Sequence, residues 1–130
     1  MSPRFDAIGI TVSDMAVSLA FYRLLGLVFA QGAEHEGHVE AQATGGVRIM
    51  FDSEEVMRSF DPMWQPPQSR GRIGLAFACA DAADVDRTHA AMVAAGHRSH
   101  LAPFDAFWGQ RYASAIDPDG NAVDLFAPLG

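Results

Sequence analysis

The residues best suited to hold a metal ion or to attack a substrate are five histidines and a single cysteine. Cys79 lies in the apolar run of residues 76–80, which is typical of a small buried hydrophobic residue rather than a nucleophile. His38 and Glu40 would share one face of a strand and, with His35 nearby, could reach one ion. The same residues could equally be polar positions at the solvent end of a hairpin. No histidine has an obvious serine or cysteine partner, so no nucleophilic triad is expected.

Charged side chains form a second candidate group. Strand alternation predicts that Glu40, Arg48, Asp52 and Asp124 point to the inner faces of the strands that carry them. Arg48 can pair diagonally with Glu40 across a hairpin. A buried carboxylate is unfavourable without a partner, so Asp124 requires a ligand cation, Arg48, Arg111 or a hydroxyl group.

Aromatic residues gather in two predicted loops. Trp64 lies in a proline-rich connection, whereas Phe104, Phe107 and Trp108 precede a strand that carries Tyr112. Such side chains can stack on a planar or cationic ligand. They could also pack against the rim of a sheet or against a second subunit.

The composition restricts the possible partners. The chain has 130 residues, which suits one domain, with 9 basic and 16 acidic residues and a net charge of −7. This balance argues against nucleic acid and anionic membranes and mildly favours a cationic ligand. A single cysteine forms no internal disulfide. With no apolar leader or spanning segment in view, we expect a cytoplasmic protein.

The elements that position these residues follow an internal repeat. Residues 8–14 and 75–81 are apolar runs that each end in an aspartate, which can cap the helical pattern that follows. The two helices are expected to end near Gly26 and Gly96. Three strands are then predicted in each half, at residues 27–34, 38–44 and 47–52, and at residues 97–102, 110–116 and 121–127.

The register of the hairpin in the first half can be tested by alternation. A three-residue loop at 44–46 separates the apolar face from the polar face, whereas a two-residue loop mixes them. The polar face would then carry His38, Glu40, Gln42, Arg48, Met50 and Asp52.

These elements predict an α+β chain of two βαβββ modules. Module 1 covers residues 5–52 and module 2 covers residues 72–128, within a single domain of residues 1–130. The connection at residues 53–71 is rich in proline and glutamine, with a short helix expected at 54–60. A connection of this length is usually functional or packed as its own small unit.

The paired modules resemble the vicinal oxygen chelate superfamily, which includes glyoxalase I, the extradiol dioxygenases and the bleomycin-resistance proteins. The resemblance rests on residues 8–14, 18–22 and 25–27, and on the Asp-Pro-Asp-Gly-Asn turn at 117–121. It implies a curved eight-stranded mixed sheet around a cavity with the helices outside, and a homodimer.

The resemblance also implies where a metal would be bound. Metal enzymes of this superfamily place a histidine near the start of the first strand of each module and a glutamate on the last strand of one or both. The matching positions here are Ala7, Gly74, Met50 and Asp124. Two have no ligand atom and Met50 offers only a thioether, so we expect no metal and no cofactor.

Small residues would instead line the inner faces of the strands. Alternation turns Ala7, Gly9 and Thr11 inward, and likewise Gly74, Ala76 and Ala78 on the matching strand. This leaves room for an organic molecule, unless Met50, Phe126 and the loop aromatics simply fill the space.

The sequence therefore favours a metal-free protein that sequesters an amphipathic or cationic organic ligand, with catalysis uncertain. The alternatives are a metal-dependent lyase or dioxygenase with shifted ligands, and a metal-free isomerase that uses Asp124 as a base. The candidate ligand-binding residues are Asp124, Met50, Arg48, Glu40, Trp108, Trp64, Phe126 and Arg111.

Overall fold

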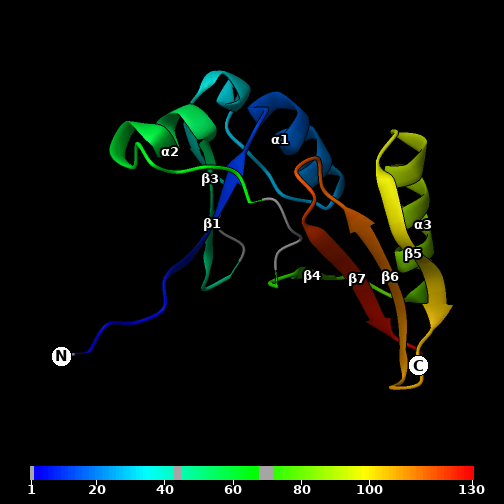
Figure 1. Cartoon of the computed structure of the whole chain (residues 1–130). Helices are drawn as coiled ribbons and strands as arrows, with labels where there is room; N and C mark the ends of the chain where they lie inside the picture. Colours follow the sequence, from blue (N-terminus) through cyan, green and yellow to red (C-terminus); the bar gives the residue numbers. More distant parts are fainter. Residues whose placement is uncertain (1, 43–44, 68–71) are drawn as a thin grey trace. The chain divides into compact units, whose positions relative to one another are not determined.

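The computed structural model describes residues 2–42, 45–67 and 72–130, which form two compact units, Met1–Pro66 and Pro67–Gly130 (Figure 1). Each unit has its own sheet, and the described residues form two α-helices in the first unit and one in the second. Within the described residues, no helix is both long enough and apolar enough to cross a lipid bilayer.

The first unit contains a three-stranded mixed sheet with the order β1-β3-β2 (Figure 1). Strand β3 pairs parallel with β1 and antiparallel with β2. In chain order the elements are β1 (Ala7–Val12), α1 (Met15–Leu24), a 3-10 turn η1 (Ala33–His35), β2 (His38–Glu40), β3 (Arg48–Ser53) and α2 (Glu54–Phe60).

Helix α1 begins and ends where the sequence predicts. The Asp14 carboxylate accepts a hydrogen bond from the backbone N–H of Val17 at 3.2 Å, and the chain leaves the helix through Gly26 with φ at +92°. The helix buries Tyr22, whose ring lies 5.1 Å from that of Phe51 on β3. This aromatic contact joins the helix to one face of the sheet.

The predicted register of β2 and β3 is confirmed. His38 pairs with Asp52, Val39 with Phe51, and Glu40 with Met50. Val39 and Phe51 are buried, whereas the side chains of the opposite face are polar or partly exposed. Residues 43 and 44, which include the start of the expected loop, lie outside the described residues.

The strand expected at residues 27–34 is wrong, and with it the count of eight strands. Leu27 and Phe29 are buried while Val28 and Ala30 are exposed, so the alternation exists. The chain, however, turns at Gly32, which has φ at +81°, and then forms η1. The described residues contain seven strands, in sheets of three and four.

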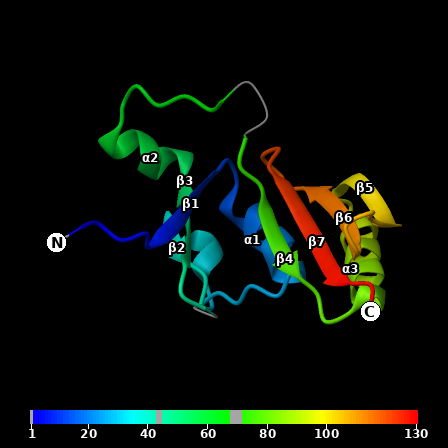
Figure 2. The same ribbon diagram turned by 90° about the horizontal axis from the view of Figure 1, so that it is seen from below.

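The second unit contains β4 (Leu75–Ala78), α3 (Ala82–Ala94), β5 (Arg98–Asp105), β6 (Gln110–Ile116) and β7 (Ala122–Pro128). The sheet order is β4-β7-β6-β5, with β4 and β7 parallel and the other pairs antiparallel (Figure 2). Asp81 caps α3 by accepting from the N–H of Asp84 at 2.8 Å, as predicted.

Helix α3 packs on one face of this sheet, against β5, β6 and β7 (Figure 2). The buried side chains Ala113 and Ala115 of β6, with Val123 and Leu125 of β7, alternate with residues of the other face. The opposite face therefore carries Tyr112, Ser114, Asp124 and Phe126. Edge strand β5 pairs irregularly, with register shifts after Ser99 and after Leu101.

Candidate functional site

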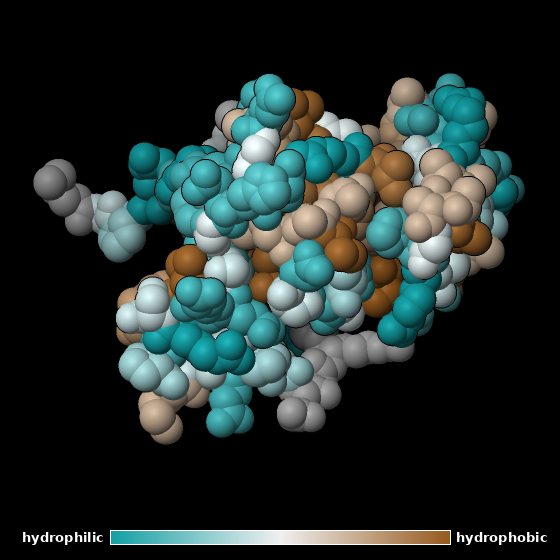
Figure 3. Space-filling view, turned by 90° about the horizontal axis from the view of Figure 1, so that it is seen from above, coloured by the Kyte–Doolittle hydropathy of each residue, from teal (hydrophilic) through white to brown (hydrophobic). Residues whose placement is uncertain are grey.

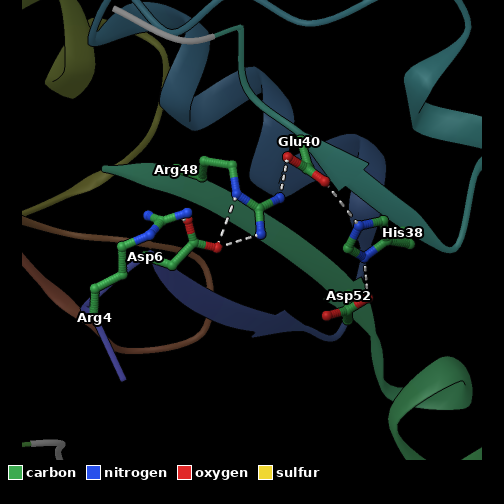
Figure 4. A network of polar contacts seen from close by, with 6 residues as sticks. All are labelled: Arg4, Asp6, His38, Glu40, Arg48 and Asp52. Atoms are coloured by element: carbon green, nitrogen blue, oxygen red, sulfur yellow. Dashed lines mark hydrogen bonds and ion pairs between the residues drawn. The ribbon is translucent and has the colours of Figure 1, made fainter. Parts of the chain in front are cut away.

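A chain of alternating charges crosses the polar face of the first unit (Figure 4). Arg48 is its centre, with its Nη2 2.6 Å from Asp6 Oδ2 and its Nη1 2.7 Å from Glu40 Oε1. Arg4 adds a longer contact of 3.5 Å to Asp6. The predicted pairing of Arg48 with Glu40 is thus present, and Asp6 is a partner that sequence reasoning missed.

His38 on β2 extends this network to Asp52 at the other end of β3 (Figure 4). Its Nδ1 lies 2.6 Å from Asp52 Oδ1, and its Nε2 lies 3.5 Å from Glu40 Oε2. The hydrogen bond to Asp52 raises the pKa of His38 against a smaller opposing effect of desolvation, and the charge of Asp52 and the contact with Glu40 add to the rise. The two carboxylates lie on opposite sides of the imidazole ring, so they do not converge on one point as metal ligands would.

The cations of the network act on the carboxylates in the opposite direction. The hydrogen bond from Arg48 lowers the pKa of both Asp6 and Glu40, against a smaller opposing effect of desolvation. Both acids are therefore held in the ionised form. Arg48, Asp6 and Glu40 are thus each paired with a side chain of opposite charge in the first unit.

Gly9 leaves open space on the sheet of the first unit. Gly9 on β1 pairs with Met50 on β3, and a Cβ placed on Gly9 would meet no atom within 4 Å. Ile10 and Val12, which point to the other face, are buried. The Met50 side chain therefore lies beside a position where the backbone itself is accessible.

In the second unit, the partner of Asp124 is a hydroxyl group. Tyr112 on β6 donates to Asp124 Oδ2 on β7 at 2.5 Å. Within the described residues, no ion pair joins Asp124 to an arginine or a histidine. Burial, and then the hydrogen bond to Asp124, raises the pKa of Tyr112 to about 12. The phenol is consequently neutral at physiological pH.

Ser114 lies directly opposite Asp124 in the register of β6 and β7. Its side chain is 1% exposed, and its Oγ has no hydrogen-bond partner among the described residues. Most buried hydroxyl groups have such a partner. Sequence reasoning did not single out Ser114, although the turn at 117–121 already fixes which residues of the two strands face each other.

Tyr112 belongs to an aromatic cluster that also contains Phe104, Phe107 and Trp108. The Trp108 ring is centred 5.3 Å from the Tyr112 ring and 5.0 Å from the Phe107 ring, in edge-to-face geometry. Trp108 also donates through Nε1 to Gln110 at 2.8 Å. Trp108 is 49% exposed and Phe107 is 97% exposed, so the aromatic cluster presents ring surface to solvent.

The remaining predicted residues lie at different places within their units. Arg111 alternates to the α3 side of the sheet, where it contacts Asp86 and Asp105 at 2.9 Å each, so it is not the partner of Asp124. Phe126 pairs with Tyr112 in register and shares its face. In the first unit, the Arg58 guanidinium lies 5.3 Å from the centre of the Trp64 ring.

On the face drawn in Figure 3, hydrophilic and hydrophobic residues are interspersed. Large apolar side chains are exposed in both units, including Phe60 and Met63 in the first unit and Ile73 and Phe107 in the second. Single exposed hydrophobic residues are common. What distinguishes the aromatic cluster is that its member Tyr112 donates a hydrogen bond to Asp124.

The residues at the four metal positions do not fit a hard divalent cation. Ala7 and Gly74 have no donor atom, Met50 has a thioether, and the Asp124 carboxylate already accepts from Tyr112. Elsewhere in the part of the chain that the structure describes, no three histidine, cysteine, aspartate or glutamate side chains are grouped to share an ion.

Comparison of the sequence with models of protein families identifies the family of this chain. Residues 4–125 match the model of the Glyoxalase/Bleomycin resistance protein/Dioxygenase superfamily. The chain belongs to this superfamily. No curated protein matches the sequence. Membership of the superfamily therefore establishes the family of the chain and not a particular activity.

Solved structures of the superfamily have the same fold. A glyoxalase/bleomycin resistance protein/dioxygenase family enzyme from Burkholderia phytofirmans PsJN is 21% identical, with a TM-score of 0.81, over 95% of this chain and 98% of that one. A glyoxalase-related enzyme from Fulvimarina pelagi is 18% identical, with a TM-score of 0.79, over 95% and 87%. A lactoylglutathione lyase from Agrobacterium tumefaciens is 18% identical, with a TM-score of 0.65, over 97% and 94%.

Proposed function

We propose that this member of the superfamily is a metal-free binding protein for a planar, cationic or amphipathic organic molecule. The observation that carries the proposal is the position of a carboxylate without a cationic partner among the described residues, Asp124, beside an exposed aromatic cluster. Aromatic faces attract planar rings and cations, and the carboxylate attracts positive charge.

The charge of the whole chain supports the same ligand class. A net charge of −7 raises the local concentration of cations and disfavours anionic ligands. The unsuitable metal positions support the metal-free part, because a hard cation would have to find its ligands elsewhere.

A separate set of ligand contacts is proposed within the first unit, considered by itself. Met50 beside Gly9 offers a polarisable side chain over open backbone, and Arg48 with Glu40 forms a charged border. A thioether makes favourable contacts with aromatic rings. Phe126, which shares the face of Asp124, is proposed as a contact in the second unit, and Trp64 in the first.

Tryptophan fluorescence provides the test. In a Trp64→Phe background, Trp108 is the single tryptophan, and it is titrated with 9-anthracenylmethylammonium and with anthracene-9-carboxylate. We expect saturable quenching by the cation, at least tenfold weaker binding of the anion, and a large loss of cation binding in Asp124→Asn. Asp61→Asn, which removes an exposed carboxylate of the first unit, should bind the cation normally.

The result that would overturn the proposal is equal binding of the two probes, or no binding of either. Elemental analysis of untagged protein tests the metal-free part. A stoichiometric divalent ion would favour the alternative of a lyase or dioxygenase with shifted ligands.

One observation favours a second candidate function, a metal-free isomerase. The Asp124 carboxyl group beside the hydroxyl of Tyr112 combines a candidate base with a proton donor. Such an enzyme would lose turnover in Asp124→Asn while its circular dichroism spectrum and melting temperature stay near those of the parent.

We also propose that the protein acts as a homodimer in the cytoplasm, in keeping with its superfamily. The exposed ring of Phe107 is a candidate for a subunit contact. Sedimentation equilibrium of the parent and of Phe107→Ser tests the dimer, and a monomeric parent would contradict it.

A further inference from the structure

The environment of Ser114 indicates which charged group the proposed ligand carries. This residue is 1% exposed, and its Oγ has no hydrogen-bond partner among the described residues. Such a group costs stability, because it has lost its water without gaining a partner. A hydroxyl in this state requires a partner other than the described residues, such as a water molecule, an ion or a ligand atom.

Register places Ser114 next to the carboxylate of the proposed site. Ser114 on β6 pairs directly with Asp124 on β7, so their side chains share a face with their Cβ atoms about 4.5–5.5 Å apart. Tyr112 lies two residues before Ser114 on the same face and reaches across to Asp124 Oδ2. The side-chain oxygens of these three residues therefore lie on the same face of the sheet.

The chemistry of these oxygens selects the ligand group. The Asp124 carboxylate only accepts hydrogen bonds, and the serine hydroxyl can accept one as well. Tyr112 donates its only side-chain hydrogen to Asp124. A group that satisfies both Asp124 and Ser114 must donate two hydrogen bonds, and a positive charge is favoured beside the carboxylate.

We propose that Asp124 and Ser114 together bind an N–H-bearing cation, namely a protonated primary or secondary amine on the ligand. This inference rests on the proposed function, since it specifies the cationic group of the same ligand. Asp124 and Tyr112 are partly exposed whereas Ser114 is buried, so the amine enters from the side of the Tyr112–Asp124 hydrogen bond. A quaternary ammonium carries no N–H and can use only the aromatic rings and the charge.

A matched pair of probes tests this proposal. Trp64→Phe protein is titrated with 9-anthracenylmethylammonium and with its N,N,N-trimethyl derivative, which keeps the ring and the charge but has no N–H. The same titrations are made with Ser114→Ala. Ser59→Ala serves as the control variant, since Ser59 is an exposed serine of α2 in the first unit.

We expect the primary amine to bind about tenfold more tightly than the quaternary probe, in line with a hydrogen bond to a charged donor. Ser114→Ala should weaken binding of the amine about tenfold and leave the quaternary probe unchanged, with a melting temperature no lower than that of the parent. Ser59→Ala should change neither affinity.

Two outcomes would overturn the inference while the proposed function stands. In one, the two probes bind the parent equally well. In the other, Ser114→Ala weakens both probes by the same factor, as a general change of the site would. Failure of both probes to bind would overturn the proposed function itself.

Discussion

Tyr112 and Asp124 are joined by a hydrogen bond of 2.5 Å between neighbouring strands of the second sheet, although they are not direct partners in the register. Tyr112 pairs with Phe126, and Asp124 pairs with Ser114. The phenol thus reaches diagonally along the sheet. This hydrogen bond stabilises a partly buried carboxylate that has no arginine partner among the described residues.

Removal of this hydroxyl should lower the stability of the second unit. Tyr112→Phe keeps the ring contact with Trp108 but leaves Asp124 without its donor. We expect a loss of about 1 kcal/mol in the free energy of unfolding, at the low end for a hydrogen bond to a charged group because Asp124 is partly exposed. Urea unfolding measures this loss. A double-mutant cycle with Asp124→Asn isolates the pair, and additive effects of the two substitutions would contradict the interaction.

Burial of Tyr112, together with the same hydrogen bond, predicts a loss of stability at alkaline pH. The pKa of Tyr112 is about 12 in the folded protein, compared with an ordinary value of 10.0. The contribution of the protonated phenol to the free energy of unfolding is therefore complete below pH 10 and is lost as the pH rises toward 12. The difference in melting temperature between the parent protein and Tyr112→Phe should therefore shrink across this pH range. A constant difference in melting temperature between the two from pH 9 to pH 11.5 would contradict the prediction.

Ser114→Ala should stabilise the protein in the absence of ligand. The substitution removes a buried hydroxyl that lacks a partner among the described residues, so we expect a gain of about 1 kcal/mol and a rise in melting temperature of roughly 3–5 °C. Ser99→Ala is the contrasting variant, because Ser99 Oγ lies 2.8 Å from the imidazole Nε2 of buried His89. It should destabilise the protein, and the same sign for both variants would contradict the assignment of Ser114.

The pKa of His38 should be measurably high. Asp52 and Glu40 stabilise the imidazolium, so the contribution of His38 to stability is complete below pH 6.5 and is lost as the pH rises through its folded pKa. Titration by nuclear magnetic resonance should show a pKa above 6.5 in the parent and a lower value in Asp52→Asn. Glu40→Gln should lower it less, because the hydrogen bond to Asp52 has the largest effect. A pKa unchanged by Asp52→Asn would count against the network.

A side chain at position 37 should destabilise the protein while Val56 is present. A Cβ on Gly37 would lie 2.5 Å from Val56 Cγ2 in α2. We expect Gly37→Ala to cost about 1–3 kcal/mol in the free energy of unfolding, as overpacking does. In a Val56→Ala background that cost should fall sharply, because the obstructing methyl group is gone. An equal cost in both backgrounds, measured by urea unfolding, would show that another contact is responsible.

Local signals in the sequence account for much of the fold. Asp14 and Asp81 are strong N-caps whose effect depends only on the following turn of helix, so both helices begin where predicted. The register of β2 with β3 follows from the separation of apolar and polar residues onto two faces. The strand predicted at residues 27–34 was wrong because the alternation at Leu27 and Phe29 does not continue. The left-handed backbone conformation of Gly32 turns the chain there.

The candidate site was less predictable, because it depends on which side chain meets which across strands. Alternation placed Asp124 on the correct face, but its partner was left open among two arginines, a ligand and a hydroxyl. Because side chains alternate along β6, Arg111 points toward α3 and Tyr112 points toward Asp124. Only the register that the 117–121 turn sets between β6 and β7 brings Tyr112 near Asp124. The orphaned Oγ of Ser114 depends on packing in three dimensions, for which the sequence has no signal.

The irregular pairing of β5 has a consequence for the behaviour of the protein at high concentration. This strand forms an edge of the four-stranded sheet, has two register shifts, and contains Pro103, which has no N–H to donate. A strand from another molecule would meet a broken row of donors and acceptors there and could not extend the ladder. Strand β5 thus protects this side of the sheet against edge-to-edge aggregation.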